Sequence, residues 1–211
     1  MGKLRFAALA VPAGRALMTP LNMALRKDPP RINNRKGGEV HEALRDWFKL
    51  IEDLAKRPTS VHELVTGNVD FYGYCDACNT GAGGVWFPLD SNLDPFVWRV
   101  QWPADIRKKL ATWYGISISD AECAGVLLQQ MGLESEVACL CHKKAVSFCD
   151  NTQSVAWVSW MESKQSRVGG RLIRDLALRA RENEMCLPES FSVAGEANTM
   201  ADVSSRSFNA K

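Results

Sequence analysis

Four carboxylates along this sequence have the residue types and surroundings for metal chemistry: Asp76, Glu122, Asp150 and Asp202. Each lies at the edge of an apolar segment. Mg²⁺ prefers hard oxygen ligands and keeps several waters, so a few carboxylates are enough to hold it. Two such ions roughly 3.5–4 Å apart can hydrolyse a phosphodiester. If the four acids meet in space, they predict a site for two Mg²⁺ (or Mn²⁺) ions that acts on nucleic acid.

Each acid also has an ordinary structural explanation. Glu122 stands three residues after Ser119 and could complete a capping box. Asp150 and Asp202 precede helical patterns and could cap helices. Asp76 precedes a glycine-rich segment and could form an Asx turn. Taken one by one, these explanations are the better ones, so the metal site depends on the elements that would bring the acids together.

Five segments carry the apolar patterns typical of strands: residues 69–75, 85–87, 96–102, 145–149 and 190–193. The first three predict an antiparallel meander, with a glycine-rich turn at residues 80–84. Residues 145–149 suit a buried central strand, and Asp150 follows it directly.

Apolar residues at helical spacing predict helices over residues 39–56, 119–131, 152–161 and 165–182, and a short helix around Met200. Residues 4–25 are broken by Pro12 and Pro20, which predicts two short helices or a helix and a loop. Residues 27–38 form a polar connector. We therefore predict a helical region at 1–65, and at 66–211 an α/β domain with a mixed sheet flanked by helices.

Four motif blocks around the acids resemble, in the same order, those of RNase H domains in retroelement reverse transcriptases. They are YCDACNTGAGGVWF (74–87), ISISDAECAGVLL (116–128), FCDNTQSVAW (148–157) and SVAGEANTMADVSSR (192–206). The resemblance implies the RNase H-like fold, with a five-stranded mixed sheet flanked by helices. It also implies Mg²⁺-dependent cleavage of the RNA strand of RNA/DNA hybrids, with the metal-binding and catalytic carboxylates at Asp76, Glu122, Asp150 and Asp202.

The resemblance has one departure in its last block. Many relatives have a His-Val-Pro-Gly run there, and this sequence has Ser192 and Ala194 at the His and Pro places. That His is thought to assist product release or proton traffic, so its absence bears on turnover more than on metal binding.

The N-terminal residues look like the end of a reverse transcriptase and the tether to its RNase H domain, as in DIRS-like or gypsy-like retrotransposons. No Tyr-x-Asp-Asp polymerase signature occurs. The implied partners are an RNA/DNA hybrid and the polymerase portion of the same polyprotein. A non-catalytic nucleic-acid-binding remnant or connection module is the alternative function.

Two further sets of residues are candidates for nucleic-acid contacts, which need cations for phosphates and polar groups for 2′-hydroxyls. Basic residues along one stripe of the predicted helix at 165–182 and just before it form the first set: Lys164, Arg167, Arg171 and Arg174. Polar residues after two of the acids form the second: Asn79, Thr80, Asn151 and Thr152. A solvated face with ion pairs and ordinary turns explain these sets equally well.

Charge and cysteine content limit the kinds of protein to which this sequence can belong. The net charge is +2, but residues 1–60 hold 12 Lys and Arg against 6 Asp and Glu, whereas the remainder holds 14 against 18. Seven cysteines without a signal segment favour free thiols in a reducing compartment, hence an intracellular protein of the cytoplasm or nucleus. No apolar run is long enough to span a membrane. Cys75, Cys78, Cys139, Cys141 and His142 could hold a structural Zn²⁺, although a strand at Cys75 argues against it.

Overall fold

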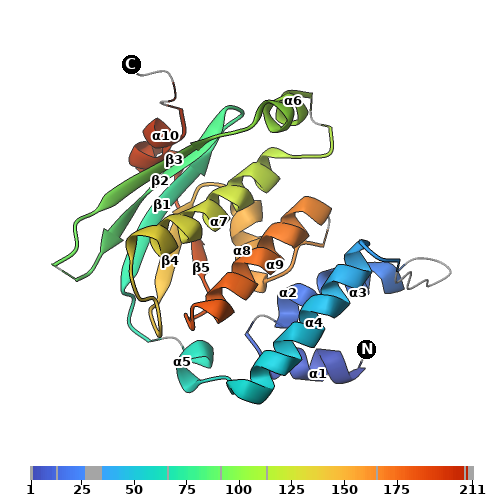
Figure 1. The fold of residues 1–211 in the computed structure, drawn as a ribbon. Helices are drawn as coiled ribbons and strands as arrows, with labels where there is room; N and C mark the ends of the chain where they lie inside the picture. Colours follow the sequence, from blue (N-terminus) through green and yellow to red (C-terminus); the bar gives the residue numbers. More distant parts are fainter. Residues whose placement is uncertain are drawn as a thin grey trace.

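A five-stranded mixed sheet forms the centre of the protein, as the computed structural model shows (Figure 1). The structure describes residues 2–12, 14–26, 35–65, 67–90, 92–112, 114–164, 166–206 and 208. The strands are β1 (Phe71–Ala77), β2 (Gly81–Pro88), β3 (Phe96–Gln101), β4 (Ala145–Cys149) and β5 (Glu189–Ser192), in the spatial order β3-β2-β1-β4-β5. The first three pair antiparallel, and β4 pairs parallel with both β1 and β5. The predicted meander and mixed sheet are confirmed.

The glycine-rich segment after β1 is a strand, so the turn predicted at residues 80–84 is wrong. The chain turns earlier, where the Cys78 amide donates to the carbonyl of Gly81 at 2.8 Å. A Cβ at Gly84 would lie 2.3 Å from Gln129 Oε1, and one at Gly83 would lie 2.5 Å from the carbonyl carbon of Ser204. These glycines therefore serve close packing on both sides of β2 rather than a turn.

Helices cover both faces of this sheet. Successive residues of a strand point to opposite faces, so the neighbours of Gly83 and Gly84 place α10 (Thr199–Arg206) on one face and α7 (Ile118–Glu136) on the other. The helices α8 (Thr152–Trp160) and α9 (Arg167–Glu182) lie on the side of α7 (Figure 1). The prediction of a sheet flanked by helices is confirmed.

The capping box of α7 differs from the predicted one. Ser117 is the N-cap residue, and its side chain accepts from the amide of Asp120, whose carboxylate accepts from the Ser117 amide at 2.8 Å. The expected pairing of Ser119 with Glu122 is wrong because the N-cap residue is Ser117, two residues before Ser119. Glu122 is thereby left without a capping role.

Three short helices precede a long one at the N-terminus: α1 (Gly2–Ala10), α2 (Gly14–Leu17), α3 (Thr19–Leu25) and α4 (Glu39–Lys56). The predicted interruption is confirmed, and Pro20 lies in the first turn of α3, where proline is tolerated. Most of the connector, residues 27–34, lies outside the described residues. Two further short helices, α5 (Val61–Leu64) and α6 (Ala104–Thr112), were not predicted. No helix in the described ranges is both long and apolar enough to cross a membrane.

The N-terminal helices form a further layer beyond α9 (Figure 1). Leu17, Leu21 and Trp47 belong to the same buried cluster as Ile173 and Leu176 of α9. The helical extension is confirmed, and its apolar faces are buried against the α/β part. The domain boundary at residue 65 stays a prediction.

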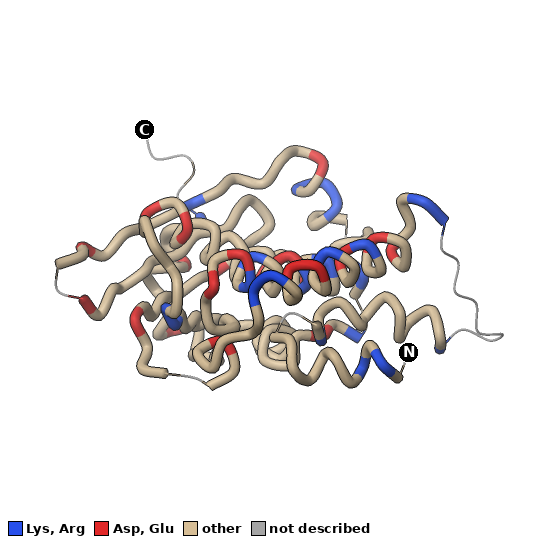
Figure 2. The backbone as a smooth tube through the Cα atoms, turned by 60° about the horizontal axis from the view of Figure 1, so that its bottom comes forward, with Lys and Arg blue, Asp and Glu red and all other residues tan. Residues whose placement is uncertain are grey.

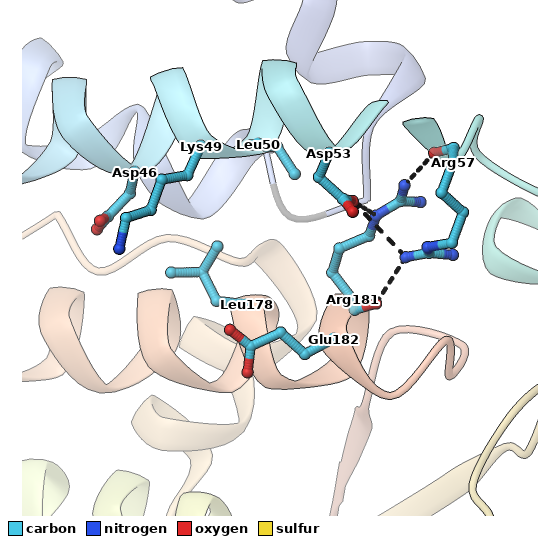
Figure 3. Close-up of a pocket in the computed structure, with 8 residues that line it drawn as sticks. All are labelled: Asp46, Lys49, Leu50, Asp53, Arg57, Leu178, Arg181 and Glu182. Carbon is cyan, nitrogen blue, oxygen red and sulfur yellow. Dashed lines mark hydrogen bonds and ion pairs between the residues drawn. The ribbon is translucent and has the colours of Figure 1, made fainter. Parts of the chain in front are cut away.

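Ion pairs join α4 and α5 to α9 beside this apolar contact. Figure 2 shows acidic and basic positions close together along the helices. The buried guanidinium of Arg181 contacts Glu63 Oε2 at 2.6 Å and Asp53 Oδ2 at 2.9 Å. Arg57 donates to the Arg181 carbonyl at 2.7 Å, at the end of a pocket between α4 and α9 (Figure 3). These side chains connect three elements at one point.

Loss of the Glu63 charge is expected to destabilise the fold. The side chains of Glu63 and Arg181 are 1% and 3% exposed. Glu63→Gln therefore removes one of the negative charges beside the buried guanidinium of Arg181. The expected cost is about 3 kcal/mol, at the low end for a broken buried pair because Asp53 remains. Thermal unfolding measures it, with Glu52→Gln on the exposed side of α4 as the matched control. Equal melting temperatures for the two variants would contradict a stabilising role for this cluster.

Candidate active site

Asp76 lies near the end of β1, and the residue is 5% exposed. The residue pairs with Gly83 in the antiparallel ladder, so it forms no Asx turn. Its Oδ2 accepts a 2.5 Å hydrogen bond from the hydroxyl of Ser205 on α10. Burial raises the pKa of Asp76, and repulsion from Asp150 and Asp202 raises it further, against the lowering effects of Ser205 and Arg206. Asp76 therefore shares an electrostatic environment with two other predicted acids.

Glu122 reaches the same place from α7, on the opposite side of β1 from α10. Its carboxylate is buried, and its Oε2 accepts from the amide of Ala77 at 3.1 Å. Burial, followed by Cys149, Asp76 and Asp150, raises the pKa of Glu122 to about 10. A buried acid that no cation neutralises is unfavourable in its charged form. Glu122 is thus placed as a ligand would be, and not as a helix cap.

Asp150 follows the last residue of β4 and is exposed. The N-cap of the next helix is Asn151, which accepts from the Ser154 amide at 3.0 Å, so Asp150 has no capping role. One oxygen of Asp150, one of Glu122 and the Sγ of Cys149 all lie within 4.8 Å of one another. Among the described residues, this is the one group of three metal-ligating side chains so close together.

Asp202 approaches from the first turn of α10. It forms an ion pair with Arg206 one turn later, and it acts electrostatically on Asp76. Neither Asp202 nor Asp76 belongs to the tight group of Glu122, Cys149 and Asp150. The ligands of a two-metal site need not all lie this close to one another, because different acids contact different ions. The four predicted acids come from β1, α7, β4 and α10 and lie around one end of the β1–β4 pair.

The donor set fits hard divalent ions. Carboxylate oxygens are the ligands that Mg²⁺ and Mn²⁺ prefer, and both buried acids have raised pKa values because burial and mutual repulsion disfavour their ionised forms. A divalent cation among them would reverse this effect and hold both acids ionised. Asp76, Glu122, Asp150 and Asp202 are therefore the residues that would hold such ions.

The polar residues predicted to touch nucleic acid lie beside the acids. Asn79 and Thr80 are exposed in the turn after β1, and Thr152 is exposed in the first turn of α8. Asn151 uses its side-chain oxygen to cap α8. Three of these side chains thus reach solvent near Asp76 or Asp150, whereas Asn151 has a structural role.

The basic stripe of α9 lies against the acids of α4. Arg171 contacts Glu39 at 3.3 Å, and Arg167 lies 3.9 Å from the same carboxylate. Arg174 is 8% exposed and lies 3.4 Å from Asp46. A solvated face would pair with Glu162, Asp175 and Glu182, and of these only Asp175 lies near the stripe within the described residues, 3.8 Å from Arg174. The other ion pairs come from α4. Because Arg174 is buried and paired, we leave it out of the proposed interface.

Lys164, just before α9, is exposed and lies 5.6 Å from the ring centre of Trp160. Arg167 and Arg171 keep more than half of their side-chain surface exposed. These three cations therefore remain accessible to phosphate even though two of them have acidic neighbours.

Residues that position the acids were missed by the sequence analysis. Gln129 of α7 is fully buried, donates to the Val85 carbonyl at 3.1 Å and accepts from the indole of Trp98. Asp120 accepts from the Gly169 amide at 3.1 Å, which joins the starts of α7 and α9. The Ser-x-x-Asp spacing at Ser117 was a usable signal for Asp120. Nothing in the local pattern distinguishes Gln129 from a surface glutamine.

Gly83→Ala is expected to displace α10 from the sheet. The added Cβ would lie 2.5–2.7 Å from atoms of Ser204 and Ser205, two of them backbone atoms, so the helix itself must shift. This shift would move Asp202 and break the contact of Ser205 with Asp76. We expect about a 10–100-fold loss in affinity for Mg²⁺, as for other supports of metal ligands. Calorimetric Mg²⁺ titration measures it.

Gly125→Ala is the matched control for this substitution. A Cβ at Gly125, on α7, meets nothing closer than 3.8 Å. Wild-type metal affinity in both variants would mean that the close approach of α10 does not position the acids.

The two cysteine-containing segments considered for structural zinc are separate. Cys75 is buried in the core, whereas Cys141 contacts Glu184 and the ring centre of His142 lies 4.6 Å from that of His62. Within the described residues, these side chains form no group with metal-ligand spacing. Cys75 lies within β1, as predicted.

No protein-family model and no curated protein matches the sequence. Among solved structures, the chain is similar to the N-terminal RNase H domain of a Mycobacterium tuberculosis protein, with 15% identity and a TM-score of 0.46 over 65% of this chain and 91% of that one. It is also similar to RNase H1 from Halobacterium salinarum NRC-1, with 12% identity and a TM-score of 0.40 over 64% of this chain and 92% of that one.

A third similar structure is the protease-reverse transcriptase of prototype foamy virus, with 8% identity and a TM-score of 0.37. The match covers 90% of this chain and 23% of the viral one. At these identities and TM-scores the matches assign no family.

Proposed function

We propose that this protein is a divalent-metal-dependent nuclease that cleaves the RNA strand of RNA/DNA hybrids. The observation that carries the proposal is the gathering of Asp76, Glu122, Asp150 and Asp202 from four elements around one end of the β1–β4 pair. The ordinary explanations do not hold in the structure: Asp76 lies in a strand, Ser117 and Asn151 cap the helices near Glu122 and Asp150, and Asp202 lies inside α10 instead of preceding it. The choice of hybrid as substrate rests on the four motif blocks around the acids.

Each acid has a distinct part in the proposed site. Glu122 and Asp150, within 4.8 Å of each other, are suited to share one ion. Asp150 and Asp202 both act electrostatically on Asp76, so Asp76 is suited to contact both ions. When bound, two Mg²⁺ ions supply an activated water and stabilise the leaving oxygen. The chain itself holds the acids in place through the Ala77 amide, the Ser205 hydroxyl and the packing of α10 on Gly83.

The exposed polar residues next to the acids are proposed to recognise the RNA strand. Asn79, Thr80 and Thr152 can bond 2′-hydroxyls or phosphates, and the 2′-hydroxyl distinguishes RNA from DNA. Lys164, Arg167 and Arg171 are proposed to contact the phosphates further along the duplex. We further propose that the chain works with a polymerase portion in a retroelement reverse transcriptase, inside the cell.

The test is cleavage of labelled duplexes by the purified chain. An RNA/DNA hybrid, an RNA duplex and a DNA duplex of one sequence are incubated with Mg²⁺, and parallel reactions contain a chelator. We expect cleavage of the RNA strand of the hybrid alone, and none with the chelator. Cleavage of all three duplexes would overturn the substrate assignment. Salt-dependent hybrid binding without cleavage, even with a reverse transcriptase polymerase portion added, would support the alternative of a non-catalytic binding module.

A further inference from the structure

A thiol lies inside the proposed metal site. The Sγ of Cys149 is one of the three ligand atoms within 4.8 Å, together with oxygens of Glu122 and Asp150. The thiol donates to Glu122 Oε2 at 3.7 Å and contacts the Ser154 hydroxyl at 3.4 Å. Cys149 is completely buried, so it forms the floor of the site, whereas Asp150 stands at its open side.

The fold fixes Cys149 in this position. It is the last residue of β4, whose parallel neighbours are β1 and β5, so the strand cannot slide without breaking both ladders. The thiol of Cys149 points toward α7, which carries Glu122, and Asp150, just after the strand, is exposed. The ion would therefore enter past Asp150 and meet the thiol last.

This donor set differs from an all-oxygen site in the ions that it favours. Mg²⁺ binds oxygen, demands octahedral geometry and gains nothing from sulfur. Zn²⁺ binds thiolate sulfur and carboxylate oxygen in tetrahedral geometry, and at N, O and S sites it generally binds more tightly than Mn²⁺. One sulfur and two carboxylates supply three of four tetrahedral positions, and a water can supply the fourth.

We propose that Cys149, Glu122 and Asp150 bind a thiophilic divalent ion, Zn²⁺, in competition with the Mg²⁺ ions of the proposed nuclease. Zinc binding stands on the geometry alone, whereas the inhibition that follows from it rests on the proposed function. On binding, the Cys149 thiol releases its proton to solvent and the sulfur forms the bond to the ion. Free zinc would then switch the nuclease off by occupying the position of an Mg²⁺ ion.

The binding test uses Cd²⁺, a thiophilic probe for Zn²⁺ whose bonds to thiolates absorb in the near ultraviolet. The metal-free, reduced chain is titrated with Cd²⁺ in the presence of excess Mg²⁺. The absorption shows how many equivalents of Cd²⁺ bind tightly to thiolates. We expect Cys149→Ser to bind one such equivalent fewer than the wild type. Cys186→Ser removes another buried cysteine, remote in the fold from the acids, and is expected to keep that equivalent.

Two more variants keep the inference testable if Cys149→Ser does not fold. Glu122→Gln and Asp150→Asn retain the thiol and remove an oxygen ligand, and each is expected to weaken the same Cd²⁺ equivalent by at least about tenfold. The proposal would be overturned if every folded variant among Cys149→Ser, Glu122→Gln and Asp150→Asn still bound this Cd²⁺ ion as tightly as the wild type.

Nuclease measurements separate this inference from the proposed function. In the hybrid assay with Mg²⁺, we expect the Zn²⁺ concentration that halves cleavage to be at least about tenfold higher for Cys149→Ser than for Cys186→Ser. A Cd²⁺ signal at Cys149 in a chain that cleaves no hybrid would contradict the proposed function and leave zinc binding intact. Hybrid cleavage with equal zinc sensitivity in both variants, and no Cd²⁺ signal at Cys149, would contradict zinc binding and support the proposed function.

Discussion

Asp150→Asn is expected to abolish hybrid cleavage while the fold persists. Asp150 is exposed and caps no helix, so an isosteric amide disturbs little of the structure. It belongs, however, to the tightest ligand group of the site. Metal ions contribute several kcal/mol to the stabilisation of charge in the transition state. Since 1.36 kcal/mol is a factor of ten, the expected loss is about 10³-fold or more.

The measurement is the single-turnover rate of hybrid cleavage at saturating Mg²⁺, together with the melting temperature. Asp94→Asn, an exposed aspartate between β2 and β3, is the matched control and should retain wild-type activity. Residual cleavage by Asp150→Asn within tenfold of wild type would mean that the acids near β4 do not form the catalytic centre. Loss of activity together with a lower melting temperature would instead indicate a role for Asp150 in the fold.

The sequence predicted the strands and long helices because their apolar periodicity depends on residues close together in the chain. The meander, β4 and α4 were found in this way. The error at residues 80–84 has a physical cause, because Gly83 and Gly84 are required by Ser204 and Gln129, which are remote in sequence. No local pattern distinguishes a glycine needed for a turn from one needed for packing.

The candidate acids were found because their motif blocks occur in order, but their surroundings were not predictable. The arginine stripe of α9 had the spacing of a solvated or phosphate-binding face. Its partners on α4 precede it by more than a hundred residues, so the sequence could not show that Arg174 is buried. The same holds for Cys149, whose place beside Glu122 results from the pairing of β4 with β1 and the packing of α7.

Glu122→Gln is expected to abolish cleavage and to stabilise the metal-free protein. Glu122 is buried beside Asp76 and Asp150, and its pKa of about 10 lies above the ordinary glutamate value of 4.5. Its neutral form is therefore the one that the fold accommodates, and glutamine mimics it while still accepting from the Ala77 amide. We expect a gain of about 1–2 kcal/mol, as for other trade-offs between stability and function. For a chain of this length, that is roughly 2–8 °C in melting temperature.

The contribution of Glu122 to the stability of the metal-free protein decreases as the pH rises. The folded chain binds the Glu122 proton more tightly than the unfolded chain, so this contribution to stability is fully present below pH 4.5. It is lost progressively as the pH rises from 4.5 toward about 10. Wild-type protein in chelator should therefore melt at lower temperature as the pH rises from 6 to 9, whereas Glu122→Gln should show a weaker decline.

Melting curves at several pH values, with chelator and with Mg²⁺, measure this difference. Glu136→Gln, at the exposed end of the same helix, is the matched control and should follow the wild type. Mg²⁺ should raise the melting temperature of the wild type most at high pH, because the ion then stabilises a carboxylate that the fold alone does not. A Glu122→Gln variant that is less stable than wild type at every pH would mean that Glu122 supports the fold as a structural acid. That result would contradict both the raised pKa of Glu122 and its assignment to the metal site, because a glutamate that the protein holds in its charged form needs no divalent ion.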